Sequence, residues 1–116
     1  MNQAQVDFQQ LRIKHILFKS KVRSVLYGGT HDADFFSRNG PINIWFNSVG
    51  FSRYRNVAEV LELKQVQQDL SSAADALFSL YDRGKIDEAQ NGLARIEELS
   101  GQFLELLSRL EGKLAA

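Results

Sequence analysis

The amino-acid sequence predicts an all-α protein that folds as an antiparallel four-helix bundle, with three long helices and a short tryptophan-containing helix between the first two. Apolar residues recur at alternating steps of three and four along three long stretches, which is the spacing of one buried helix face. Most glycines and the only proline, Pro41, interrupt or end these stretches. The chain has 116 residues, 44% of them hydrophobic, so we expect a single domain over 1–116 with its core over about 4–114.

The first long helix is expected over residues 3–27. Its apolar face is formed by Ala4, Phe8, Leu11, His15, Phe18, Val22 and Val25. Gly28 and Gly29 follow at once. Glycine often ends a helix because it adopts the left-handed conformation that closes the last turn, so the helix is predicted to end there.

The connection over residues 28–56 is rich in turn-forming residues, but an apolar piece over 42–49 is expected to form one or two turns of helix. Trp45, Phe46 and Tyr54 lie in or just after this piece. Large aromatic side chains either anchor a connection to the core or offer a contact surface to a partner, and the core is favoured here. We therefore expect a packed connection.

The second and third long helices are expected over residues 57–81 and 86–114. The four residues between them suffice only for a tight antiparallel reversal. Two glycines, Gly92 and Gly101, lie inside the third stretch, where each costs about 1 kcal/mol relative to alanine. We interpret them as points where two helices approach closely.

Charge is unevenly distributed although the net charge is zero. Residues 1–58 carry a balance of +5 and residues 59–116 a balance of −5. Five basic residues lie within twelve positions of the first helix: Arg12, Lys14, Lys19, Lys21 and Arg23. No aromatic or glycine-rich nucleic-acid motif accompanies them, so no nucleic-acid partner is expected. We interpret the cluster as a solvated helix face that meets acidic residues of the second half, or of a second copy.

The composition limits the chemistry that the chain can perform. The absence of cysteine excludes disulfides, thiolate nucleophiles and cysteine-based zinc sites, and fits a cytoplasmic protein. No run of 18 apolar residues occurs, so membrane insertion is not expected. His31, Asp32 and Asp34 form a short loop cluster, but aspartates are common in loops because they stabilise turns. No pattern of catalytic residues is present, so an enzyme is not expected.

Polar residues interrupt two of the three apolar faces. His15 lies in the middle of the first helix, and Gln67 lies in the middle of the second, with Ser71 one turn further on. A buried polar group without a partner costs about 1–3 kcal/mol. We therefore expect His15 to hydrogen-bond to Gln67 or to a buried water. The alternative is a ligand or metal pocket at the centre of the bundle.

Three short motifs have the pattern of a known family. His15 is followed three residues later by a phenylalanine and then a lysine. Gly40 stands five residues before Trp45, and the pair Gln67 and Ser71 has the spacing i, i+4 in a long helix. Together these motifs resemble the chemoreceptor zinc-binding (CZB) domain over roughly residues 8–112. The resemblance implies a four-helix bundle whose zinc is held by three histidines and one cysteine.

Carried over to this chain, the zinc-binding positions of the family are His15, Gly40, Gln67 and Ser71. Only His15 keeps its nitrogen donor, because Gly40 has no side chain and the other two offer neutral oxygens that suit zinc poorly. The resemblance therefore implies a member without zinc and without another cofactor. Zinc could bind only if His31, Asp32 or Asp34 supplied substitute ligands.

The function expected from this resemblance is non-catalytic. It implies a bacterial, cytoplasmic signalling or regulatory domain, associated with chemotaxis, that acts through protein–protein contacts or as a homodimer. One alternative is a helical-bundle adaptor or chaperone-like protein unrelated to the family. Another is a sensor of a small ligand with a pocket around His15.

Overall fold

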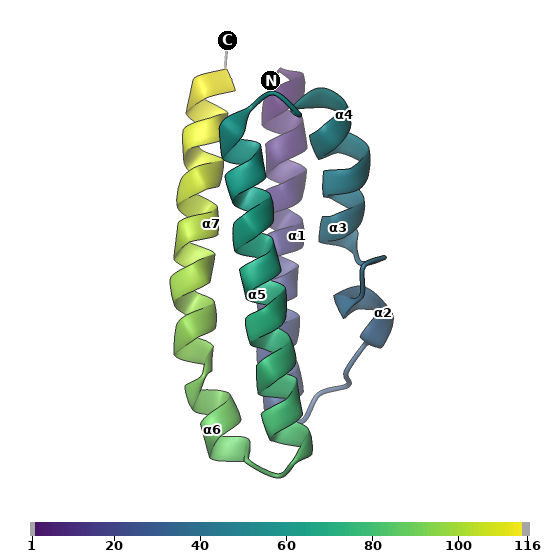
Figure 1. The fold of residues 1–116 in the computed structure, drawn as a ribbon, viewed down its shortest axis with the longest axis vertical. Helices are drawn as coiled ribbons and strands as arrows, with labels where there is room; N and C mark the ends of the chain where they lie inside the picture. Colours follow the sequence, from purple (N-terminus) through teal and green to yellow (C-terminus); the bar gives the residue numbers. More distant parts are fainter. Residues whose placement is uncertain (1, 115–116) are drawn as a thin grey trace.

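The computed structural model describes residues 2–114, and within them every regular element is helical. Three long helices account for most of the structure: α1 (Gln3–Leu26), α5 (Ala58–Asp82) and α7 (Leu93–Leu114). They lie side by side in a body of 49 × 24 × 21 Å (Figure 1). The predicted all-α class is confirmed, and so are the three long helical stretches.

Two of the long helices run in the same direction and the third runs in the opposite one (Figure 1). Helices α1 and α5 both run away from the end of the molecule that holds the N-terminus, and α7 runs back toward it (Figure 1). The two ends of the described chain therefore meet, and the Asn2 side-chain amide donates a hydrogen bond of 3.0 Å to the Leu114 carbonyl oxygen. No helix among residues 2–114 combines the length and the hydropathy that a membrane span requires.

The connection between α1 and α5 contains more helix than the sequence predicts. It forms α2 (Ala33–Phe36), α3 (Pro41–Trp45), the π-helical turn η1 (Phe46–Gly50) and α4 (Phe51–Arg53). The last three follow one another without a break, so the predicted helix over 42–49 extends over 41–53. The connection thus holds several short helical segments where one short helix was predicted, so the structure is not a simple set of four helices. The segment 41–53 packs along α1 (Figure 1).

The third predicted helix is divided in two. Helix α6 (Ile86–Asn91) ends at Gly92, and α7 begins at the next residue. A side chain at Gly92 would collide with the Leu77 side chain, so the glycine lets the chain approach α5 closely. The interpretation of Gly92 as a close contact is therefore confirmed. For Gly101 it is wrong, because a side chain there would meet open space.

The helix ends are stabilised by local interactions. Asn2 and Gln5 form a capping box at the start of α1: the Asn2 side chain accepts from the Gln5 backbone amide at 2.9 Å, and the Gln5 side chain accepts from the Asn2 amide at 3.0 Å. The turn after α5 contains Gly84 at a φ of +80°, a conformation that other residues adopt only with strain. The tight reversal predicted for residues 82–85 follows from it.

The apolar faces predicted from the spacing form one core. Trp45, Phe46 and Tyr54 belong to this core, with relative exposures of 2%, 1% and 9%. Buried in this way, they anchor the connection against α1 and do not form a contact surface. The other large, fully buried side chains include Phe8, Leu11, Leu26, Leu63, Leu70, Ile96, Leu99, Phe103, Leu107 and Leu110.

Ion pairs join the basic first half to the acidic second half across the α1–α7 contact. Arg12 pairs with Glu111 at 2.6 Å, and Lys19 pairs with Glu97 at 2.8 Å. Each pair is partly exposed, so each contributes at most about 1 kcal/mol. They show that part of the predicted contact between the two halves is formed within one chain.

Candidate functional site

The central polar group comprises His15, Gln67, Ser71 and Ser100. His15 is fully buried on α1, where its ring stacks on Phe103 with the centroids 4.4 Å apart. Its Nε2 atom lies 2.8 Å from the Ser100 hydroxyl oxygen, which α7 supplies. Its Nδ1 atom has no hydrogen-bond partner among the described residues. His15 is therefore only half satisfied.

The environment of His15 strongly favours the neutral ring. Burial, together with the positive charges of Lys19 and Arg12, lowers the pKa of His15 to about 4, although Glu97 opposes this in part. A neutral imidazole that is fully enclosed cannot exchange protons with a substrate in solution. The ring is therefore held as a packing group with one hydrogen bond.

Gln67 and Ser71 form the second half of the central polar group, on α5. The Gln67 side-chain amide donates to the Ser71 hydroxyl oxygen at 3.2 Å, whereas its Oε1 atom has no partner among the described residues. Gln67 is only 3% exposed. The predicted hydrogen bond between His15 and Gln67 is thus absent, because each side chain bonds to a different serine. The partner of His15, Ser100, comes from the third apolar face and was not predicted.

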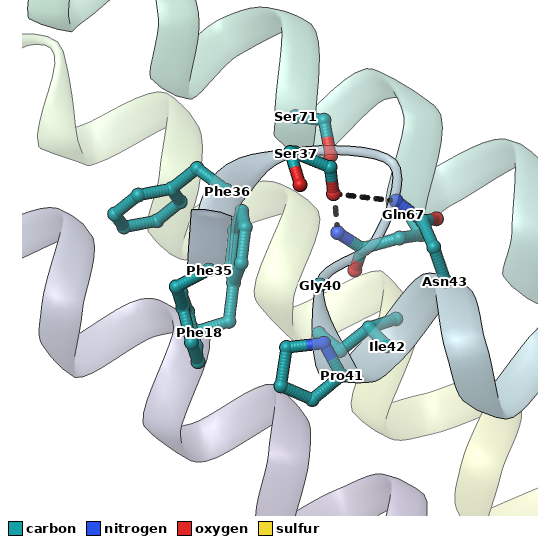
Figure 2. Close-up of a pocket in the computed structure, with 10 residues that line it drawn as sticks. All are labelled: Phe18, Phe35, Phe36, Ser37, Gly40, Pro41, Ile42, Asn43, Gln67 and Ser71. Atoms are coloured by element: carbon teal, nitrogen blue, oxygen red, sulfur yellow. Dashed lines mark hydrogen bonds between the residues drawn. The ribbon is translucent and has the colours of Figure 1, made fainter. Parts of the chain in front are cut away.

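Three of the four positions implied by the family resemblance line one small pocket. Gly40, Gln67 and Ser71 surround it together with residues of α1, α2 and α3, as Figure 2 shows. His15 is not among its lining residues. The cavity measures about 10 Å³, which is the room that one water molecule needs.

The backbone packs tightly around Gly40 at the wall of this pocket. A side chain at Gly40 would collide with the Phe35 carbonyl oxygen and would lie 3.1 Å from that of Ser37. The Asn43 side-chain amide also donates to the Ser37 carbonyl oxygen at 3.3 Å, one of the two hydrogen bonds drawn in Figure 2. The local structure is therefore built for glycine, and a cysteine at this position would have to move the chain.

The substitute metal ligands considered from the sequence do not come together. His31 packs against the rings of Phe36 and Phe78, with centroids 5.5 and 4.6 Å away. The Asp32 side chain caps α2 by accepting from the Phe35 amide at 3.1 Å. In the described part of the chain, no three His, Cys, Asp or Glu side chains lie close enough to hold a metal ion.

A second polar group, not predicted from the sequence, lies near the start of α1. We call it the Asp7 cluster: Gln3, Asp7, Trp45, Arg53 and Tyr54. Arg53 donates to both carboxylate oxygens of Asp7 at 2.8 Å, and the Tyr54 hydroxyl donates to Oδ2 at 2.6 Å. Gln3 donates to Oδ1 at 2.8 Å, and the Trp45 indole donates to the Asp7 backbone carbonyl at 3.1 Å.

These contacts determine the ionisation of the Asp7 cluster. Burial alone would raise the pKa of Asp7, but the hydrogen bonds from Tyr54, Arg53 and Gln3 outweigh it and lower the pKa. Burial, followed by the hydrogen bond to Asp7, raises the pKa of Tyr54 to about 12. The carboxylate is therefore charged and fully bonded, and it fastens the segment 41–54 to α1. The sequence does contain one indication of this cluster. Asp7 is the only acidic residue before Asp32, and it lies beside the apolar position Phe8.

Helix α1 also has an apolar face that none of the residues 2–114 covers. Ile13, Ile16 and Leu17 are 67%, 55% and 45% exposed. They lie on the side of the helix opposite the buried positions Leu11, His15 and Phe18. Adjacent exposed aliphatic side chains of this size often mark a surface for contact with another molecule.

Comparison of the chain with protein-family models, with curated proteins and with solved structures finds no match.

Proposed function

We propose that this chain is a non-catalytic regulatory domain that acts through protein–protein association. In the finer form of the proposal it is a zinc-free relative of the chemoreceptor zinc-binding domain and works in bacterial, cytoplasmic signalling such as chemotaxis. The segment 41–53 then counts as the short member of an antiparallel four-helix bundle. The associating molecule is a second copy, as in the expected homodimer, or a protein of the signalling pathway.

The observation that carries the proposal is the composition of the pocket at the former zinc positions. Gly40, Gln67 and Ser71 line it together, and they offer only neutral hydrogen-bonding groups. The hydrogen bond between Gln67 and Ser71 joins two of the positions at which the family resemblance implies zinc ligands. A pocket with room for only one water molecule suits a structural centre and leaves the outer helix faces to carry function.

The state of His15 supports the absence of catalysis. General acid–base chemistry needs a group that can reach a substrate and that titrates near the working pH. His15 is enclosed and holds one hydrogen bond to Ser100, and its pKa is about 4. The Asp7 carboxylate, which is also buried and ionisable, has its oxygens occupied by Arg53, Tyr54 and Gln3. Neither group is arranged for reaction.

One observation favours a second candidate, a sensor of a small polar ligand. The Oε1 atom of Gln67 is buried at the wall of the pocket and has no partner among the described residues. A polar groove of about 700 Å³ adjoins the pocket, and the two share the lining residues Phe36, Ser37, Asn43 and Ser71. A ligand that donates a hydrogen bond could satisfy this atom. In this form the sensing residue is Gln67 and not the His15 of the sequence-based alternative. The adaptor alternative shares the association proposed above and differs only in ancestry.

The first test is the metal content of the protein purified without chelator or metal-affinity resin, measured together with its mass in solution. The proposal expects less than about 0.1 zinc per chain and an assembly larger than the monomer, alone or with a partner. Zinc near one per chain would contradict the zinc-free form. A matched control is the His15→Leu variant, whose metal content should equal that of the parent protein.

A further inference from the structure

The uncovered face of α1 is apolar at Ile13, Ile16 and Leu17, continues over the exposed Ser20 and Ser24, and is bounded by grooves. It ends at Tyr27, the residue after the helix, which is 59% exposed. At 1.5 Å per residue the stretch from Ile13 to Tyr27 spans about 20 Å, or four helical turns. We call this stretch the α1 face.

A groove runs along each side of the α1 face. On the α7 side, Ile16, Lys19 and Arg23 line a groove of about 370 Å³ with residues of α7. On the α3 side, Lys14 and Ile44 help to line a groove of about 390 Å³. Ile44 is 54% exposed and extends the apolar surface beyond α1. A ridge between two grooves is the shape that a partner helix can straddle with its own side chains.

Both borders of the α1 face carry positive charge that the chain only partly neutralises. Lys14 makes no ion pair with any residue of the described chain. Arg23 lies over the Tyr27 ring at 5.2 Å, and Lys21 reaches Asp32 only at 3.8 Å. Lys19, which is paired with Glu97, is about one-third exposed. Carboxylates placed along either border would find cations within reach.

This charge pattern argues against a second copy on the α1 face. If two α1 helices pair antiparallel about a two-fold axis, each border faces the same border of the other copy, and if they pair parallel, the opposite borders meet. Both borders are basic, so either arrangement opposes like charges: Lys14 and Lys21 on one border, and Lys19 and Arg23 on the other. Like charges across an interface disfavour that pairing.

We propose that the α1 face is the docking surface for an amphipathic helix of a partner protein whose apolar stripe is bordered by glutamate or aspartate. This inference rests on the proposed function and specifies the chemistry of the partner. The partner helix lays its apolar stripe on Ile13, Ile16 and Leu17 and sets its carboxylates along the basic borders. An anionic membrane could also attract basic and apolar side chains, but a lipid surface makes no use of the two grooves.

The test uses the full chain and three synthetic helical peptides of about 18 residues. The first has a leucine stripe with glutamate borders, the second has the same stripe with lysine borders, and the third has glutamate borders with a glutamine stripe. Binding is measured by fluorescence anisotropy at low and high salt. We expect the first peptide to bind at least tenfold more tightly than either of the others, and high salt to weaken its binding several-fold.

Variants of the chain locate the bound peptide. Ile16→Gln combined with Leu17→Gln should weaken binding at least tenfold, and Lys14→Glu combined with Arg23→Glu should do the same. Leu61→Gln is the matched control, because Leu61 is 53% exposed on α5, away from the α1 face. It should change binding less than twofold. All these positions are exposed or partly exposed, and circular dichroism checks that each variant folds.

Each contrary outcome overturns the inference. Equal binding of the glutamate-bordered and lysine-bordered peptides would show that charge does not select the partner. Binding to vesicles with 30% phosphatidylserine, but to no peptide, would assign the face to a membrane. A dimer that the Ile16 and Leu17 variant separates would assign it to a second copy. Such a dimer would leave the proposed association in place and would reject only the acidic partner helix. Zinc near one per chain, in contrast, would contradict the proposed function whatever the result with the peptides.

Discussion

The two buried polar groups of this protein differ in how completely they are satisfied. In the Asp7 cluster a charged carboxylate accepts bonds from three side chains, and Arg53 balances its charge. In the central polar group all members are neutral, and one atom each of His15 and Gln67 has no partner in the described chain. The comparison shows that the fold tolerates incomplete bonding only where no charge is buried. A buried charge without partners would cost several kcal/mol more.

The largest expected effect on stability comes from a substitution that removes the buried charge of the Asp7 cluster. Asp7→Ala removes the acceptor of the buried Tyr54 hydroxyl and the ion pair of Arg53 at once. We expect a loss of about 3–4 kcal/mol in the free energy of unfolding, measured by urea titration followed by circular dichroism. Glu105→Ala is the control, because its ion pair with Arg109 is mostly exposed, and its loss should cost less than about 1 kcal/mol. A change below 1 kcal/mol in Asp7→Ala would show that the cluster does not hold the segment 41–54.

The next largest effect is the pH dependence of stability that His15 of the central polar group causes. The pKa of His15 is about 4 in the folded protein and about 6.5 when unfolded. As pH falls from 6.5 to 4, the unfolded chain therefore binds a proton that the folded chain does not. Stability should fall by about 3 kcal/mol over this range.

The matched variant for this pH dependence is His15→Leu, in which the slope between pH 6.5 and 4 should flatten. The lowered pKa of Asp7 adds its own loss only below its usual value of 3.8, so the two groups separate by pH. Urea titrations at pH 7, 5.5 and 4 measure the contribution of His15, and further titrations at pH 3.5 and 3 measure that of Asp7. An unchanged slope in His15→Leu would mean that the ring is solvated.

A smaller effect tests the single bond that His15 makes. Ser100→Ala leaves both ring nitrogens without a partner and should lower stability by about 1–2 kcal/mol. Ser71→Ala should cost less, because Ser71 is only partly buried and its bond to Gln67 is longer, 3.2 Å against 2.8 Å. Equal losses in thermal unfolding at constant pH would contradict this ranking.

The smallest expected effect is a gain in stability, in contrast to the losses expected from the substitutions above. Gln67→Leu removes a buried oxygen that has no partner and replaces it with a side chain of similar size. We expect a change between zero and a gain of about 1 kcal/mol, measured by the same thermal unfolding. A loss above 2 kcal/mol would show that Oε1 has a partner, such as an enclosed water or a ligand, and would favour the sensor candidate.

The sequence predicts the long helices well because each carries a regular apolar face. It also identifies His15 and Gln67 as buried polar residues, since they interrupt that regularity. Their partners could not be predicted, because the choice of Ser100 depends on how α1 and α7 are offset along their length. The Asp7 cluster was missed for a related reason. Its residues are up to 51 positions apart, between Gln3 and Tyr54, and only the path of the connection brings them together.

The break at Gly92 shows a different limit. Spacing alone continues through it, because Ala89, Leu93 and Ile96 keep the helical period. The break coincides with the close approach of Gly92 to Leu77 of α5, and that approach is a property of the packed structure. The uncovered face of α1 was likewise not predicted, since the exposed positions Ile13, Ile16 and Leu17 lie between the regular buried ones.

The position of Trp45 gives the molecule a built-in optical reporter. It is the only tryptophan in the chain, it lies in the segment 41–53, and its indole nitrogen bonds to the backbone of Asp7. Its emission therefore follows the attachment of that one segment, whereas far-ultraviolet ellipticity follows mainly the three long helices. If the segment detaches before the helices unfold, the two signals will separate along a denaturant titration. A partner or ligand that loosens the segment would be visible in the unlabelled protein.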